Sequence, residues 1–487
     1  MQTETESLPP PSLELAAPSI GPLTISNRAG AIANHDTEHE LPTYAHARNA
    51  PAPPSPIVAP RARPATTGAQ GSANALAVEA HRYLETTKAK KWLSLFVKSR
   101  AGTTTSLPVF YESDVIAGRV ELDLDKAEGY KAVTAKIQGG TTFVGQEEEI
   151  FLKEEQVLWT PSATESKLRG KHSWSFSFSL PADVSVKDGE LGKKGTFRLP
   201  PSFSERASPA YIDYKIIVTI RRGFLKVNQT LVTNFAFIPS IVPELPSVLR
   251  RLAYSDGSLL IGPEGDPQGW SVLPPVQIKG TLFNAKDVEV TCTLALATPL
   301  CYAVGSPIPL VITFTGEDPH ALDVLAEPRA IQLLLRRSMA TGLEATDDNG
   351  ARRTDNHFYE NSGMAYFWPS WEATAAPNKR VLQGELELPR DLKPSFKFPN
   401  FTIRYTLDLF PFKAAGFTPT PGTLTEGKYP LYLSKPVDIA TKQADGVTPH
   451  SYAPPGYEKP KDVDYIKSLG VLENGNQRFL AHGHTHV

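Results

Sequence analysis

The chain has 487 residues, of which 50 are Lys or Arg and 52 are Asp or Glu, so its formal net charge is −2. This balance gives no extended positive field, which argues against a dedicated nucleic-acid-binding protein. Proline accounts for 44 residues, about 9% of the chain against about 5% in average proteins, and so much proline argues against a mostly helical fold.

The N-terminal residues 1–75 are predicted to be a disordered, proline-rich segment. Twelve prolines fall within the first 64 residues, and such a stretch cannot bury enough apolar surface to offset the entropy lost on ordering. The segment begins with acidic residues and has no basic region followed by an apolar one, so no secretory signal is expected. Residues 76–91, which end in a basic cluster, are predicted to form a short helix or linker.

Alternation of apolar and polar residues predicts short strands over most of the remaining chain. Residues 174–180 (WSFSFSL) and 401–409 (FTIRYTLDL) are typical, because every second side chain is apolar. This period of two places one set of side chains toward a core and the other toward solvent. We expect an all-β fold of two consecutive antiparallel immunoglobulin-like sandwiches, over residues 92–242 and 276–440.

Proline-rich segments separate and follow the two predicted sandwiches. Residues 243–275 are predicted to be an interdomain linker, and residues 441–487 a flexible C-terminal tail. Residues 290–316 carry no charge but are interrupted by three prolines, so two strands joined by a turn explain them better than a membrane-spanning helix.

Known catalytic and metal-binding motifs do not occur in the sequence. No G-x-S-x-G, H-E-x-x-H or G-x-x-x-x-G-K-[ST] pattern is present. Cys292 and Cys301 are interpreted as buried, reduced thiols, and the glutamates of residues 147–155 as solvated charges on an edge strand. The alternating His482, His484 and His486 lack the four fixed ligands of a structural metal site. We therefore expect no enzymatic activity, no cofactor and no metal.

Two proline–tyrosine motifs lie outside the predicted sandwiches. Pro454, Pro455 and Tyr457 form a PPxY motif, and Leu41, Pro42 and Tyr44 form the LPxY variant. A polyproline II segment presents its rings to an aromatic groove while the tyrosine fills a neighbouring pocket, which is the way WW domains recognise their ligands. Both motifs are predicted to bind WW domains.

The strand patterns of the first half resemble the first sandwich of the α-arrestin family. The likeness rests on residues 108–124 (PVFYESDVIAGRVELDL), 172–181 (HSWSFSFSLP) and 210–222 (AYIDYKIIVTIRR). In the first of these segments Asp114 precedes an apolar pair and Gly118, as in the family, but Ser113 stands where the family often has glycine. The second half agrees in length, order and strand character. The LPxY motif is N-terminal, whereas the family's motifs are usually C-terminal.

The resemblance implies a non-enzymatic adaptor. Its sandwiches would engage cytosolic regions of membrane transporters or receptors, and its motifs would recruit a WW-domain HECT-type ubiquitin ligase, leading to ubiquitination and endocytosis of the cargo. Such a protein would be cytoplasmic, recruited to the plasma membrane or endosomes, with only peripheral membrane contact and no nucleic acid partner. The alternative is an arrestin-like sorting scaffold of the retromer type, which recruits no ligase.

Overall fold

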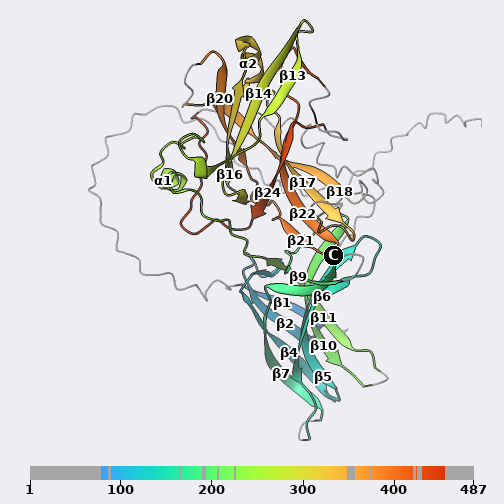
Figure 1. The fold of residues 1–487 in the computed structure, drawn as a ribbon. Helices are drawn as coiled ribbons and strands as arrows, with labels where there is room; N and C mark the ends of the chain where they lie inside the picture. Colours follow the sequence, from blue (N-terminus) through green and yellow to red (C-terminus); the bar gives the residue numbers. More distant parts are fainter. Residues whose placement is uncertain are drawn as a thin grey trace, which may run out of the picture. The chain divides into compact units, whose positions relative to one another are not determined.

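The fold is all-β, as the alternating pattern predicts, with two short α-helices in the described part of the chain (Figure 1). The computed structural model describes residues 78–85, 89–163, 166–188, 193–205, 208–223, 226–347, 357–371, 376–420, 424 and 430–455. The predicted disordered segment 1–75 lies outside these residues. The described strands form two β-sandwich halves, in which neighbouring strands are antiparallel apart from two short parallel pairs, β3 with β11 and β15 with β24.

The first half contains two sheets and a hairpin. One sheet has the strand order β1 (Val78–Glu85), β2 (Lys91–Ser99), β4 (Val115–Glu128), β7 (Leu168–Ser179). The other has the order β3 (Val109–Tyr111), β11 (Gln229–Ile238), β10 (Ala210–Arg221), β5 (Ala132–Phe143), β6 (Glu149–Trp159). The hairpin pairs β8 (Asp183–Asp188) with β9 (Lys193–Arg198).

Strand β10 shows how the alternating sequence forms the core of this half. Ile212, Tyr214, Ile216 and Val218 are all buried, and the residue after each of them is only partly buried. Each buried aliphatic side chain contributes about 1.5–3 kcal/mol relative to an exposed one. The one hydroxyl in this row also has a partner, since Tyr214 Oη donates to the carbonyl of Pro200 at 2.6 Å.

The turn between β3 and β4 is shaped by Ser113 and Asp114. Ser113 has a φ of 74°, in the left-handed region that favours glycine. The Asp114 carboxylate accepts two hydrogen bonds from the Arg100 guanidinium, both at 2.7 Å, and one from the Tyr111 amide at 2.8 Å. Burial alone would raise the pKa of Asp114, but these donors outweigh it and lower the pKa. The turn therefore keeps a glycine-like backbone although serine occupies it.

The second half also contains two sheets. The larger has the strand order β19 (Tyr366–Pro369), β20 (Lys379–Glu387), β16 (Pro307–Thr315), β14 (Lys286–Ala297), β13 (Val276–Leu282), β23 (Phe417–Pro419), and β12 (Trp270–Val272) also pairs with β14. The smaller has the order β15 (Cys301–Ala303), β24 (Leu433–Ala440), β22 (Phe401–Leu409), β17 (Leu333–Thr341), β18 (His357–Met364), and β21 (Phe396–Phe398) pairs with β22.

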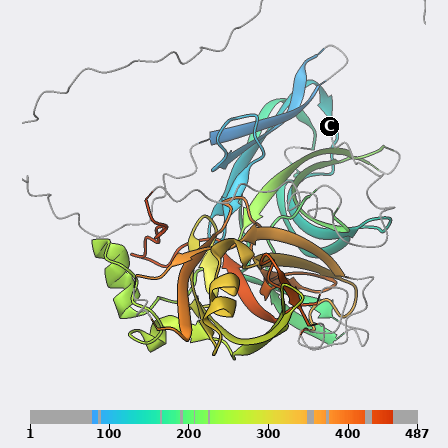
Figure 2. The ribbon, with the colours of Figure 1, turned by 90° about the horizontal axis from the view of Figure 1, so that it is seen from above.

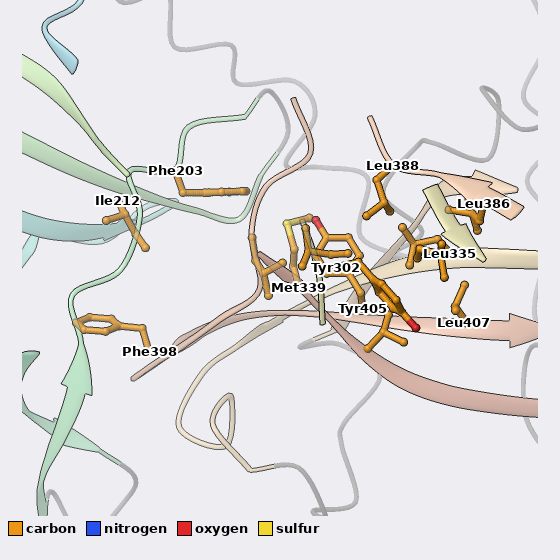
Figure 3. Packing of buried hydrophobic residues seen from close by; sticks show 14 of the residues in the cluster. Phe203, Ile212, Tyr302, Leu335, Met339, Leu386, Leu388, Phe398, Tyr405 and Leu407 are labelled. Atoms are coloured by element: carbon orange, nitrogen blue, oxygen red, sulfur yellow. The ribbon is translucent and has the colours of Figure 1, made fainter. Parts of the chain in front are cut away.

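Side chains from both of these sheets pack into one core. Figure 3 shows Leu386 of β20 near Leu335 of β17 and Leu407 of β22, and all three side chains are fully buried. The uncharged residues 290–316 supply parts of this core as strands, as predicted, but they form three strands, β14, β15 and β16, where two joined by a turn were expected. No helix among the described residues is long and apolar enough to cross a membrane.

An ion pair and an aromatic pair connect the two halves. Arg337 of β17, only 6% exposed, donates to both carboxylate oxygens of Glu205 at 2.9 and 2.6 Å. Burial opposes the charge of Arg337, but pairing with Glu205 outweighs it and raises the pKa of the guanidinium. The rings of Phe203 and Phe401 lie edge to face at 5.1 Å. The bidentate geometry of the pair on a buried guanidinium makes this contact specific.

The structure corrects the predicted helix or linker over residues 76–91. Residues 78–85 form strand β1, which pairs with β2 along its whole length. The His81 ring stacks on the Phe96 ring of β2 at 4.2 Å, and Ala80 is buried. Pairing with β2 and the stacked rings thus override a weak helical preference, as tertiary context often does.

The predicted linker over residues 243–275 is also more ordered than expected. It contains helix α1 (Val248–Asp256), the 3-10 turn η2 (Pro267–Gly269) and strand β12. Ser247 caps α1 by accepting a hydrogen bond from the Arg250 amide, and Gly257 ends the helix with a φ of 73°. The other helical segments, α2 (Pro319–Leu325) and η3 (Pro328–Ala330), lie inside the second half.

Candidate partner-binding site

The described chain ends within the predicted C-terminal motif. Pro454 and Pro455 are both exposed. Tyr457 lies outside the described residues, as do Leu41, Pro42 and Tyr44 of the N-terminal motif. The structure therefore places only the first half of the PPxY motif, and it places it outside any strand, where a partner can reach it.

The predicted flexible tail over residues 441–487 is wrong for its first part, because residues 441–455 pack against the folded chain. Thr441 Oγ1 donates to the carbonyl of Pro239 at 2.7 Å and accepts from the Ile241 amide at 2.9 Å. Ala444 and Val447 are buried. The polar, proline-containing composition of this segment predicted a flexible tail. The prediction fails for residues 441–455 because parts of the chain that are distant in sequence bury a few of their side chains.

A buried carboxylate on β20 holds this segment just before the motif. Glu385 is 3% exposed. Its Oε1 accepts hydrogen bonds from the hydroxyls of Tyr366, at 3.1 Å, and Ser451, and its Oε2 accepts one from the Tyr452 amide at 3.1 Å. No Lys or Arg among the described residues forms an ion pair with it. A buried charge is costly unless hydrogen bonds compensate it, so the donors from Ser451 and Tyr452 are strong contacts that fix these two residues.

An aromatic group fixes the same segment to helix α1. The Tyr254 ring of α1 lies 5.7 Å from the His450 ring and 6.2 Å from the Tyr452 ring, and the rings of His450 and Tyr452 are 4.5 Å apart. Burial, and next the neighbouring Tyr254, raise the pKa of Tyr452 to about 12. Burial likewise raises the pKa of Tyr254. Both phenols are therefore neutral near pH 7 and pack as uncharged rings.

Helix α1 is itself held rigidly on the second half. Arg250, 3% exposed, donates to the carbonyls of Thr298, at 2.9 Å, and Gly269, and its guanidinium lies over the Trp270 ring at 4.7 Å. These contacts turn one face of the helix inward. Tyr254 is thus a fixed anchoring point for the segment that leads to the motif.

Two hollows among the described residues are small or open. One of about 40 Å³ lies between the residues that precede α1, strand β15 and residues 443–449. It has room for a few water molecules at most. A hollow of about 410 Å³ at the end of the first half is lined by Trp92, Tyr130 and Arg222 together with acidic side chains. Neither resembles an enclosed, mostly apolar ligand pocket.

Two glutamates of the cluster form ion pairs, and of the two cysteines expected to be buried, Cys292 is buried whereas Cys301 is only partly buried. In the glutamate cluster, Glu148, directly before the edge strand β6, pairs with Lys215 of β10 at 2.8 Å, and Glu155 of β6 pairs with Arg221 of β10 at 2.6 Å. Neither cysteine is in a disulfide, and burial raises the pKa of Cys292, and that of Cys301 to about 11. The described residues contain no cluster of three metal-ligating side chains; the histidines at 482, 484 and 486 lie outside them.

Sequence reasoning identified the motif but missed the residues that hold it. Glu385, Ser451, Tyr452 and Tyr254 come from three distant parts of the chain, and only a charged residue at an inward position of a strand could have drawn attention to Glu385. Known proteins add no further indication: no family model and no curated protein matches this sequence.

Proposed function

We propose that this protein is a non-enzymatic adaptor that links membrane cargo to a WW-domain ubiquitin ligase of the HECT type. The observation that carries the proposal is the position of the PPxY motif. Its prolines Pro454 and Pro455 are exposed and follow directly on an anchored segment, outside every described strand. A polyproline segment in that setting is open to an aromatic groove.

The fold is compatible with this role. Two β-sandwich halves with large outer sheet faces offer surfaces for protein partners, and the strand patterns of the first half resemble those of α-arrestins. In the proposed division of labour, the sandwiches engage cytosolic regions of transporters or receptors at the plasma membrane or endosomes. The PPxY motif, together with the LPxY motif of Leu41, Pro42 and Tyr44, engages the ligase.

Two motifs on one chain would act through avidity. A single short peptide contact is small, so each motif alone is expected to bind in the micromolar range, about −8 kcal/mol or less favourable. If the ligase carries several WW domains, the second contact becomes intramolecular and strengthens association without new contacts. The two motifs should then be partly redundant.

A mutant cycle tests the proposal. Tyr44→Ala and Tyr457→Ala each remove the side chain that fills the pocket beside the polyproline groove. Co-precipitation with the ligase and ubiquitination of the cargo are measured for the parent, both single variants and the double variant. We expect the double variant to lose far more association than either single one. Ubiquitination that continues unchanged in the double variant would contradict the adaptor mechanism and favour a sorting scaffold without ligase recruitment.

A further inference from the structure

The hollow at the end of the first half is built by both sheets of that half. It is lined from one sheet by Trp92 of β2 and by side chains near the end of β4, and from the other by Arg222, directly after β10, and Gln229, the first residue of β11. The Lys131 amide donates to the carbonyl of Arg221 at 2.8 Å, which holds the turn after β4 against the end of β10. Figure 2 shows the blue strands β1 and β2 on one side of this half and curved teal and green strands on the other.

The hollow has the size of a small-molecule site. Its volume is about 410 Å³, and ligand sites in proteins commonly measure about 300–1,000 Å³. It is open to solvent, and polar groups make up much of its lining. An apolar ligand needs enclosure, whereas a hydrophilic ligand can leave part of its surface in water. The hollow therefore suits a hydrophilic molecule.

The charges around the hollow balance. Three carboxylates and three cations line or border it, those of Asp123, Asp125 and Glu128 and those of Lys90, Lys126 and Arg222. Lys90 Nζ lies 3.2 Å from the carboxylate of Asp123 and 2.5 Å from that of Asp125. Equal numbers of opposite charges give no net field that would attract an ion of either sign. The ligand expected here is neutral overall.

The same wall offers hydrogen-bond donors, acceptors and an aromatic ring. The Glu128 carboxylate only accepts, the Arg222 guanidinium only donates, and the Gln229 amide does both. A hydroxyl group is at once a donor and an acceptor, so a molecule with several hydroxyls can bond to all three side chains. Trp92 is partly exposed and adds a flat ring, whose electron-rich face packs well against the C–H groups of a sugar.

We propose that this hollow binds a neutral carbohydrate, with a pyranose ring packed on Trp92 and its hydroxyls bonded to Glu128, Arg222 and Gln229. A free amino acid is also neutral overall, but its two polar ends would leave most of these donors and acceptors without a partner. Because the hollow is open, a longer saccharide can continue into solvent. The site does not include the segment that leads to the PPxY motif, so the inference is independent of the adaptor role.

Saturation-transfer NMR tests the site on the intact chain. Maltotriose, cellotriose and mannotriose are each mixed with the protein, and free leucine serves as a zwitterionic probe. We expect saturation transfer to at least one of the sugars and none to leucine. Transfer to none of the three sugars, or stronger transfer to leucine than to every sugar, would overturn the assignment to a carbohydrate.

Substitutions then locate the binding by calorimetric titration of the sugar that shows transfer. Trp92→Leu keeps an apolar side chain against the core but removes the flat ring, and it should weaken binding at least fivefold. Gln229→Ala leaves the backbone pairing with Ile220 in place and should weaken binding at least threefold. Trp371→Leu is the matched control, because this tryptophan is 54% exposed and lies outside the hollow. Unchanged affinity in either variant of the hollow, or an equal loss in Trp371→Leu, would overturn the inference.

Discussion

Replacing Glu385 by glutamine should release the segment that leads to the motif. The carboxylate accepts one hydrogen bond from the Tyr452 amide and one from the Ser451 hydroxyl, and both are charge-assisted. Glutamine has nearly the same shape but is uncharged and keeps only one acceptor oxygen, so it cannot accept from the Tyr452 amide and the Ser451 hydroxyl at separate oxygens, and the charge assistance of both bonds is lost.

The expected size of the effect follows from these contacts. A hydrogen bond to a charged group contributes about 1.5–3 kcal/mol. Losing charge assistance at both bonds removes about as much as one such bond, which raises the equilibrium constant for local opening by about 10- to 150-fold, since each 1.4 kcal/mol is a factor of ten. The core around β20 should survive, because the other residues of the strand keep their pairing with β16.

Amide hydrogen exchange measures this opening directly. In the parent, peptides that contain Tyr452 should exchange slowly, and in Glu385→Gln the Tyr452 amide should exchange faster by roughly the factor given above. Glu387→Gln is the matched control, because it makes the same change two residues along the same strand at an exposed position, and it should leave exchange unchanged. Equal protection of Tyr452 in the parent and in Glu385→Gln would refute the anchoring role of the carboxylate.

Three further predictions concern the folded halves. Gly118→Ala should lower the free energy of unfolding by about 1–3 kcal/mol in urea titrations, because its Cβ would lie 2.3 Å from a backbone oxygen of β2, whereas Gly129→Ala, which meets nothing within 4 Å, should be nearly neutral. Asp114 has a lowered pKa in the folded state, so its contribution to stability is complete above its unfolded pKa, near 3.8, and is lost as the pH falls through the folded value. Asp114→Asn should therefore reduce the dependence of the free energy of unfolding on pH, measured in urea titrations from pH 5 down to pH 2.5. An unchanged pH dependence would contradict the pairing with Arg100. Cys292 is buried with a raised pKa, so a maleimide should label it at pH 7.5 only after denaturation, and rapid labelling of the native protein would be inconsistent with this burial.

Local pattern was sufficient to predict the β architecture. Strand β10 alternates without interruption, and its burial follows the sequence residue by residue, because a half-buried strand has a fixed period of two. The same reasoning placed strands in the uncharged residues 290–316. The two motifs could likewise be recognised, because their chemistry lies in four adjacent residues.

Contacts between distant residues could not be predicted in this way. Residues 78–85 form a strand because β2 is available to pair with them, and nothing in their own composition requires it. The tail over residues 441–455 is ordered because Glu385 and Tyr254, more than 60 residues away, provide hydrogen bonds and rings for it. An ion pair such as that of Arg337 with Glu205 also cannot be detected from periodicity, since its partners are 132 residues apart.

Titration of a tandem WW-domain protein into the intact chain tests the adaptor role most directly. Calorimetry of the parent should show binding in the micromolar range or tighter, weakened by each of Tyr44→Ala and Tyr457→Ala and abolished in the double variant, with the thermal unfolding of all four proteins unchanged. Binding of equal strength to the parent and to the double variant, or no binding to the parent, would contradict the proposal that these motifs recruit a ligase.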